Sequence, residues 1–116
     1  QVNNANPVKA VEFIRRSGLP GRMLNEYVYG GYLIWAAPEH PVFVDGRADV
    51  YEPAGVLADY VKFTTSEIGS QFILDKYRID YCFVAQDEPI ARVLPLLPGW
   101  RKVYGDKQSV IFARQN

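Results

Sequence analysis

Two short runs of apolar residues place the strongest constraint on how this chain folds. Val42–Val44 lies between Pro41 and Asp45 and contains no polar residue, and Ile79–Ala85 is a second, mostly apolar run. A short apolar run of this kind is typical of a strand that is covered on both faces. We therefore expect Val42–Val44 to be a central strand of a sheet.

Helical patterns surround these runs. A first helix is predicted at 7–17, because apolar residues recur there at helical spacing, Asn6 and Pro7 have cap and first-turn chemistry, and Gly18 suits the residue after the end. Elsewhere the pattern predicts helices at 29–37, 53–63, 68–77 and 88–94, a short strand at 22–25, and a terminal β-hairpin formed by 100–104 and 109–114.

Strands that alternate with helices indicate an α/β fold. We expect three layers: a mostly parallel central sheet of about five strands, helices on both faces, and a C-terminal antiparallel β-hairpin. A chain of 116 residues can bury one core without a metal or disulfide. We interpret 1–116 as a single domain, with 1–6 as a linker, and its polar start without Met predicts a fragment of a longer polypeptide.

The balance of charge and the cysteine content exclude several classes of protein. The 13 basic and 13 acidic residues give a formal net charge of zero, whereas nucleic-acid binding needs a strongly basic face. We therefore expect no nucleic-acid partner. Cys82 is the only cysteine, and its apolar neighbours indicate a buried, unreactive thiol.

A polar cluster, Asp45-Gly46-Arg47-Ala48-Asp49, follows the predicted central strand. Ligands of open α/β sheets bind outside the carboxyl ends of strands, so this position favours a functional role. Asp45 and Asp49 could share a cation or divide acid and base roles, and Arg47 could bind a carboxylate or phosphate. The alternative is structural, with Asp45 capping a turn at Gly46 and Arg47 pairing with Asp49.

A second cluster, Asn25–Trp35, combines aromatic residues with Gly30 and Gly31 at the start of a predicted helix. Glycine at that position lets a ligand approach the backbone N–H groups, and Tyr27, Tyr29 and Tyr32 could stack on a sugar ring. The alternative is that Tyr32 and Trp35, three residues apart, belong to the core. The glycine pattern matches neither of the common nucleotide-binding motifs.

Catalytic and metal-binding motifs are not evident. His40 is the only histidine, and no serine or cysteine lies in a nucleophile motif. We therefore assign no catalytic residue, metal site or cofactor to this domain.

The order of motifs along the chain, from about Pro7 to Ala113, is more informative than any one of them. They are Pro-x-x-Ala-Val-Glu-Phe, Gly-x-x-Gly-Arg-Met-Leu-Asn, Tyr-Gly-Gly-Tyr-Leu-Ile-Trp, Pro-Val-Phe-Val-Asp-Gly-Arg, Leu-Asp-Lys-Tyr-Arg-Ile-Asp-Tyr and Trp-x-x-Val-Tyr-x-Asp. This series resembles the extracytoplasmic C-terminal domain of bacterial polytopic membrane proteins of the GT-C glycosyltransferase type, which use lipid-linked sugar donors.

A more distant resemblance joins Tyr27–Ile34 and Asp45–Arg47 to the C-terminal region of the oligosaccharyltransferase catalytic subunit. There, a Trp-Trp-Asp-Tyr-Gly motif, which recognises the Ser/Thr of an acceptor sequon, precedes an apolar strand ending in Asp. When Gly31 is aligned with the glycine of that motif, Tyr29 stands where the family has its aspartate. The polar member of the motif is therefore absent here, and only the Gly-Tyr helix start and the Asp-Gly turn are shared.

The resemblance implies a soluble lid or acceptor-docking domain above a membrane-embedded active site, at the extracytoplasmic (periplasmic) face of the bacterial inner membrane. The catalytic acidic residues would lie in the transmembrane part of the same polypeptide, so the domain would be inactive alone although its parent is a glycosyltransferase. The implied partners are that transmembrane part and a glycan or peptide acceptor. Residues at the functional edge would be Tyr27, Tyr29, Tyr32, Asp45 and Arg47.

Two alternatives stay open. The domain could be a purely structural cap of the membrane enzyme. It could also be a free-standing α/β enzyme or ligand-binding domain that uses the Asp45-Gly46-Arg47 loop together with Asp49. Apolar segments of about 20 residues upstream of Gln1 would distinguish a membrane protein from a free-standing one.

Overall fold

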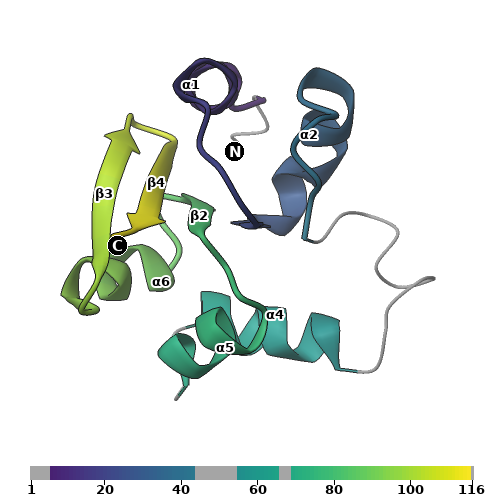
Figure 1. Ribbon diagram of the computed structural model, residues 1–116. Coiled ribbons are helices and arrows are strands. Elements are labelled where there is room, and N and C mark those ends of the chain that lie inside the picture. Colours follow the sequence, from purple (N-terminus) through teal and green to yellow (C-terminus); the bar gives the residue numbers. More distant parts are fainter. Residues whose placement is uncertain (1–5, 44–54, 66–68, 116) are drawn as a thin grey trace.

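The computed structural model describes residues 6–43, 55–65 and 69–115 (Figure 1). In chain order, the elements are α1 (Val8–Ser17), β1 (Met23–Asn25), the 3₁₀ helix η1 (Tyr27–Tyr29), α2 (Gly30–Ala36), α4 (Val56–Thr64), α5 (Ser70–Lys76), β2 (Tyr81–Ala85), α6 (Ile90–Val93), the 3₁₀ helix η2 (Leu94–Leu96), β3 (Trp100–Gly105) and β4 (Ser109–Arg114).

Within the described residues, the strands form a four-stranded sheet in the order β1-β2-β4-β3. β1 and β2 are parallel, with Leu24 opposite Cys82. β4 is antiparallel to both of its neighbours, β2 and β3. The predicted C-terminal hairpin is confirmed, and its second strand lies inside the sheet.

The expectation of a mostly parallel sheet of about five strands is therefore wrong, although the fold is α/β. The hairpin returns through β4 next to β2, so antiparallel pairing extends to the middle of the sheet. Residues 41–43 form no strand, and Val44 lies outside the described residues. The backbone N–H of Phe43 donates instead to the side-chain oxygen of Asn25, and the Phe43 ring packs edge-on against Tyr77.

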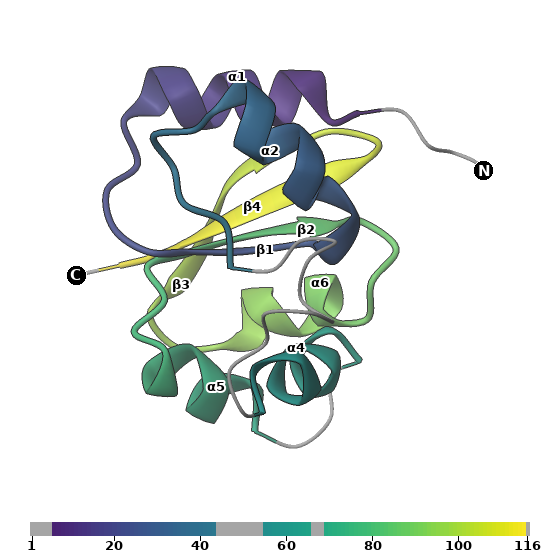
Figure 2. The same cartoon turned by 90° about the vertical axis from the view of Figure 1, so that its right-hand side faces the viewer.

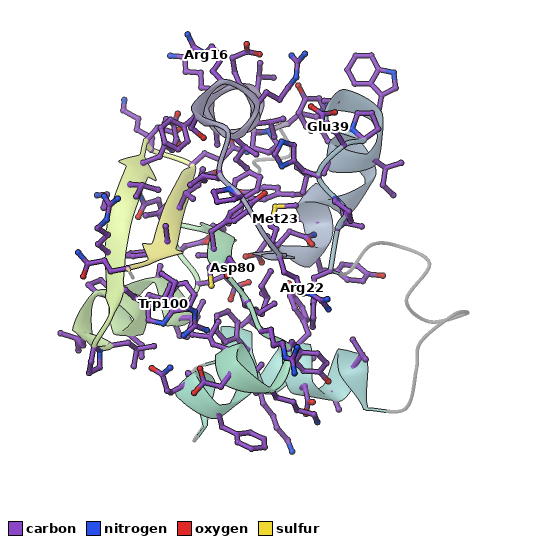
Figure 3. All side chains as sticks on the ribbon, in the orientation of Figure 1. Arg16, Arg22, Met23, Glu39, Asp80 and Trp100 are labelled. Carbon is purple, nitrogen blue, oxygen red and sulfur yellow. The ribbon has the colours of Figure 1, made fainter. Side chains whose placement is uncertain are left out.

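Helices cover both faces of the sheet (Figure 2). Side chains of a strand alternate between its two faces, so each strand contributes to two cores. Met23, Tyr81, Phe83, Ile111 and Ala113 pack with α1 and α2 on one face. Leu24, Cys82, Val84, Val110 and Phe112 pack with α4, α5 and α6 on the other, together with Trp100 (Figure 3).

The helix boundaries follow local sequence chemistry with some shifts. α1 ends at Gly18, which has a left-handed φ of 66°, as its position predicts. The expected cap by Asn6 is wrong, because Pro7 occupies the cap position and no side chain caps the helix. The predicted helix at 88–94 is shorter, since Pro95 converts its last turn into η2.

Within the described ranges, no helix has the length and hydrophobicity of a membrane span.

Candidate functional site

A cavity of about 590 Å³ lies at the carboxyl ends of the two parallel strands, and we call it the carboxyl-end pocket. Parallel strands bring their carboxyl ends to the same edge of a sheet, which is where α/β folds bind ligands. The lining residues come from the segments after β1 and β2, the β3–β4 turn and the start of α1: Asn6, Pro7, Glu26, Val28, Tyr29, Ala85, Gln86, Asp87, Glu88, Lys107 and Gln108.

Glu26 is the most unusual residue of this pocket, because its side chain carries a titratable group in the interior. The residue is 5% exposed. Its backbone N–H continues the β1–β2 ladder by donating to the carbonyl of Phe83 (2.8 Å). Its side-chain Oε1 accepts the N–H of Ala85 (3.0 Å). Glu26 therefore connects the ends of both parallel strands.

Burial raises the pKa of Glu26 to about 8, with further contributions from a hydrogen bond to Glu88 and from the charges of Glu88 and Asp87. The bond from Ala85 acts in the opposite direction, because it stabilises the ionised form. Burial dominates, so Glu26 is mostly protonated at neutral pH. A protonated carboxyl group can both donate and accept a hydrogen bond.

Two tyrosines hold the surroundings of Glu26 in place. The hydroxyl of Tyr29 shares a hydrogen bond with that of Ser109 (2.9 Å), and its ring stacks on Phe83 at a centroid distance of 4.8 Å. Burial raises the pKa of Tyr29 to about 12. On the other side of the sheet, the hydroxyl of Tyr60 accepts the N–H of Tyr27 (2.6 Å). Both tyrosines are neutral at physiological pH.

An exposed apolar surface on η1 and α2 lies beside the carboxyl-end pocket, and Val28 belongs to both. We call this the α2 face and define it by Val28, Tyr32 and Trp35, at positions four and three residues apart that fall on one side of a helix. Val28 is 75% exposed and Trp35 is 78% exposed, and the rings of Tyr32 and Trp35 are 6.0 Å apart. The interpretation of Trp35 as a core residue is wrong, whereas Tyr32 is half-buried.

The structure separates the tyrosines that the sequence grouped together. Tyr27 packs against the core on the side of α4, while Tyr29 and Tyr32 pack on the side of α1. Tyr29 lines the carboxyl-end pocket, and Tyr32 belongs to the α2 face. The other candidates, Asp45, Arg47 and Asp49, lie outside the described residues.

Sequence reasoning missed the acidic residues of the pocket, Glu26, Asp87 and Glu88. A signal for them exists: Glu26 directly follows the predicted strand at 22–25, and Asp87 and Glu88 follow the predicted strand at 79–85. Applying the rule about carboxyl ends to these two strands would have found the pocket.

The remaining candidates have structural partners. Nδ1 of His40 lies 3.1 Å from the hydroxyl of Tyr81. Cys82 is fully buried, as expected, and burial raises the pKa of its thiol. In the part of the chain that the structure describes, no three His, Cys, Asp or Glu side chains are arranged to hold a metal ion.

Comparison with known proteins identifies a similar fold. No family model and no curated protein sequence matches the chain. Among solved structures, it is similar to the C-terminal globular domain of an oligosaccharyltransferase from Archaeoglobus fulgidus, with a TM-score of 0.69 and 11% sequence identity. The match covers 99% of each chain. The two domains therefore share a fold over their whole length.

Proposed function

We propose that this chain is an accessory domain of an integral membrane glycosyltransferase that uses a lipid-linked sugar donor. The observation that carries the proposal is the whole-length similarity to the C-terminal globular domain of an oligosaccharyltransferase. In this role the domain lies at the extracytoplasmic side of the membrane as a lid or acceptor-docking unit, and the catalytic groups belong to the transmembrane part of the same polypeptide.

The α2 face supports an interaction with that transmembrane part. A tryptophan and a valine with about three-quarters of their surface exposed, next to a half-buried tyrosine, are costly to leave in water. Aromatic anchors of this kind commonly dominate the binding energy of an interface. We propose that Val28, Tyr32 and Trp35 pack against the membrane-embedded domain when the parent protein is intact.

The carboxyl-end pocket supports a second contact, with the acceptor. Its polar lining, including Glu26 and Glu88, can exchange hydrogen bonds with the hydroxyl or amide groups of a glycan or peptide. Tyr27 and Tyr29 then act by positioning the start of α2 beside the pocket. Asp45, Arg47 and Asp49 remain candidate acceptor contacts on the sequence argument alone.

The test is sugar transfer by the intact parent protein in membranes, with lipid-linked donor and acceptor supplied. Trp35→Ser should lower transfer by about tenfold or more, because it removes an interface anchor. The matched control is Leu96→Ser, since Leu96 is 79% exposed but lies on η2, away from α2. Equal activity of both variants, or a parent gene without membrane spans, would contradict the proposal.

A second candidate function is that of a free-standing ligand-binding domain, and the specific observation in its favour is the carboxyl-end pocket. This function needs no membrane part. Binding of a small polar ligand to the 116-residue chain, abolished by a Glu88→Gln substitution, together with a parent gene lacking membrane spans, would favour it over the accessory role.

A further inference from the structure

A second cavity, of about 720 Å³, lies at the amino ends of the two parallel strands, and we call it the amino-end pocket. Arg22, Met23 and Asp80, which are labelled in Figure 3, belong to its lining. The rest of the lining comes from Gly21, residues 41–43, the first residue of α4 and the two residues that follow α5. The amino-end pocket shares no lining residue with the carboxyl-end pocket, and its volume is sufficient for a small organic molecule.

Two arginines, Arg22 and Arg78, give this lining a positive charge. Within the described residues, no ion pair or side-chain hydrogen bond includes either guanidinium group. The acidic residue of the lining is Asp80, whose carboxylate accepts the backbone N–H of Arg22 (2.7 Å). Two guanidinium groups against one carboxylate leave an excess of one positive charge. Because guanidinium groups bind carboxylate and phosphate oxygens in a planar, two-pronged geometry, the pocket suits an oxyanion.

Arg78 also occupies a backbone position that favours glycine. Tyr77 caps the end of α5, and Arg78 follows with a φ of 55°, the only positive φ of a non-glycine residue in the part of the chain that the structure describes. Its N–H donates to the carbonyl of Asp75 (3.1 Å), and the N–H of Ile79 donates to the carbonyl of Leu74 (2.9 Å). Glycine is the usual residue at this point of such a helix end. Backbone strain is concentrated at sites with a role beyond folding, which makes the Arg78 side chain a candidate for binding.

Much of the remaining lining is apolar. The rings of Phe43 and Tyr77 meet edge-on at a centroid distance of 5.0 Å, and Val42 and Val56 are half-buried beside them in the lining. The hydroxyl of Tyr77 already donates to the carboxylate of Asp59 (2.6 Å). An apolar group placed in the pocket would therefore cover aromatic and aliphatic surface and release water from it.

We propose that the amino-end pocket binds a small amphipathic anion, whose carboxylate or phosphate group is held by Arg22 and Arg78 and whose apolar body packs against Phe43 and Tyr77. Binding makes and breaks no covalent bond. The proposal does not depend on the accessory role in a glycosyltransferase, because it uses only side chains of this chain.

An NMR titration of the ¹⁵N-labelled 116-residue chain tests the proposal, with hexanoate and hexyl phosphate as probes. The backbone amides of Arg22, Phe43 and Arg78 should shift and saturate, and the anion that binds more tightly identifies the preferred group. Two further probes each carry one half of the chemistry: 1-hexanol lacks the charge, and inorganic phosphate lacks the apolar body. Both should bind at least about tenfold more weakly. Shifts that do not saturate with either anion, or equal binding of one of the two partial probes, would overturn the proposal.

Two variants connect the binding to the arginines. Arg22→Ala and Arg78→Gly should each weaken binding by at least about tenfold. Arg78→Gly should also raise the melting temperature, since glycine adopts the left-handed conformation without strain, so a failure to fold would not explain its loss of binding. The matched control is Arg101→Ala, because Arg101 is exposed on β3 and removes the same charge outside the pocket lining. Its affinity should stay within about twofold of the wild type. Unchanged affinity in Arg78→Gly, or an equal loss in Arg101→Ala, would overturn the proposal.

Discussion

The charged side chains at the two ends of β2 differ in their partners. At the amino end, near Tyr81, Arg114 reaches across the sheet edge and its guanidinium donates to the carbonyl of Ile79 (2.9 and 3.0 Å) and to the carboxylate of Asp75 (3.3 Å). At the carboxyl end, near Ala85, Glu26 is buried, and the charges of Glu88 and Asp87 add to the effect of burial in raising its pKa.

The amino end holds further paired groups, beside the amino-end pocket of about 720 Å³ that Arg22, Arg78 and Asp80 line. The carboxylate of Asp80 accepts the backbone N–H of Arg22 (2.7 Å), and Figure 3 shows these two residues near each other. The Arg114 guanidinium also lies 4.8 Å from the centre of the Trp100 ring. Hydrogen bonds to charged groups of this kind add stability.

This contrast is the reason why the carboxyl end is the candidate functional site. Proteins depart from local rules of charge pairing mainly at sites that have a role beyond folding. The buried carboxyl of Glu26 is such a departure, because no ion pair of the described residues includes it and it lines a cavity, whereas the charged groups Arg114 and Asp80 at the amino end are hydrogen-bonded. Five predictions test the contrast, from the largest expected effect to the smallest.

The largest effect should be the pH dependence that Glu26 imposes on stability. Its pKa is raised by burial from 4.5 to about 8, so the folded protein holds a proton that the unfolded chain releases above pH 4.5. The contribution of Glu26 to the free energy of unfolding should therefore be most favourable below pH 4.5. The free energy of unfolding should then fall as the pH rises to about 8, by up to about 1.4 kcal/mol per pH unit. Urea unfolding at pH 5, 6, 7 and 8 measures this slope. Glu26→Gln should abolish it, and an unchanged slope in that variant would contradict the assignment.

A large effect is also expected at the amino end, from Gly21→Ala. Gly21 has a φ of +92°, and a Cβ there would lie 2.7 Å from the Cβ of Asp80, which side-chain rotation cannot relieve. We expect a loss of about 2–3 kcal/mol in the free energy of unfolding. Gly31→Ala is the matched control, because a Cβ at Gly31 meets nothing within 4 Å and alanine favours the helix. An equal effect of the two substitutions in thermal unfolding would contradict a close approach of Gly21 to Asp80.

The next prediction concerns Arg114→Ala, which removes the hydrogen bonds to two carbonyls and to Asp75 and the contact with Trp100. The free energy of unfolding should fall by about 2 kcal/mol, and Arg114→Lys should restore only part of it, since an ammonium group cannot replace the planar fork. Arg101→Ala, an exposed change on β3, is the control and should cost less than about 0.5 kcal/mol. A full rescue by lysine would show that charge alone matters.

A smaller effect is expected from Tyr29→Phe at the carboxyl end. This change removes the hydrogen bond to Ser109 (2.9 Å) and a longer one to the carbonyl of Gln108 (3.5 Å), and it retains the stacking on Phe83. Chemical denaturation should show a loss of about 1 kcal/mol. The α2-face residue Tyr32 provides the comparison, because Tyr32→Phe keeps the ring and removes only a hydroxyl, so its effect should be within about 0.5 kcal/mol. A larger loss in the free energy of unfolding for Tyr32→Phe than for Tyr29→Phe would contradict the packing described for these tyrosines.

The smallest effect on stability should come from Trp35→Ser. The indole is 78% exposed, so its removal should change the free energy of unfolding of the isolated chain by less than about 0.5 kcal/mol. The same substitution is expected to impair sugar transfer by the intact parent protein. A strong destabilisation of the isolated chain would assign Trp35 to the core and remove the basis for the α2 face.

Much of the fold could be predicted from local patterns. Helix α1, the parallel strand β2 and the terminal hairpin each follow from the period of their apolar residues and from Gly18 and the turn at 105–108. The position of each strand in the sheet could not be predicted from local patterns, because strand pairing is decided by contacts between segments that are distant in the sequence. Val42–Val44 has the composition of a central strand, yet the N–H of Phe43 binds the side chain of Asn25 and β4 takes the position beside β2.

The site was less accessible to sequence reasoning than the fold. The sequence identifies Tyr29 as a candidate because it is aromatic. It does not show that the Tyr29 ring stacks on Phe83 while Trp35 stays exposed. The role of Glu26 depends on burial and on a neighbour, Glu88, that is distant in the chain. Spacing along the sequence does not encode such a contact.

The most direct test of the contrast between the two ends of β2 is a titration of the glutamate carboxyl carbons of the folded chain by ¹³C NMR. We expect Glu26 to titrate near pH 8, far above the ordinary value of 4.5, and its resonance is identified by its loss in Glu26→Gln. A Glu26 midpoint near 4.5 in a chain that remains folded would contradict the account, because the carboxyl end would then hold an ordinary, ionised carboxylate.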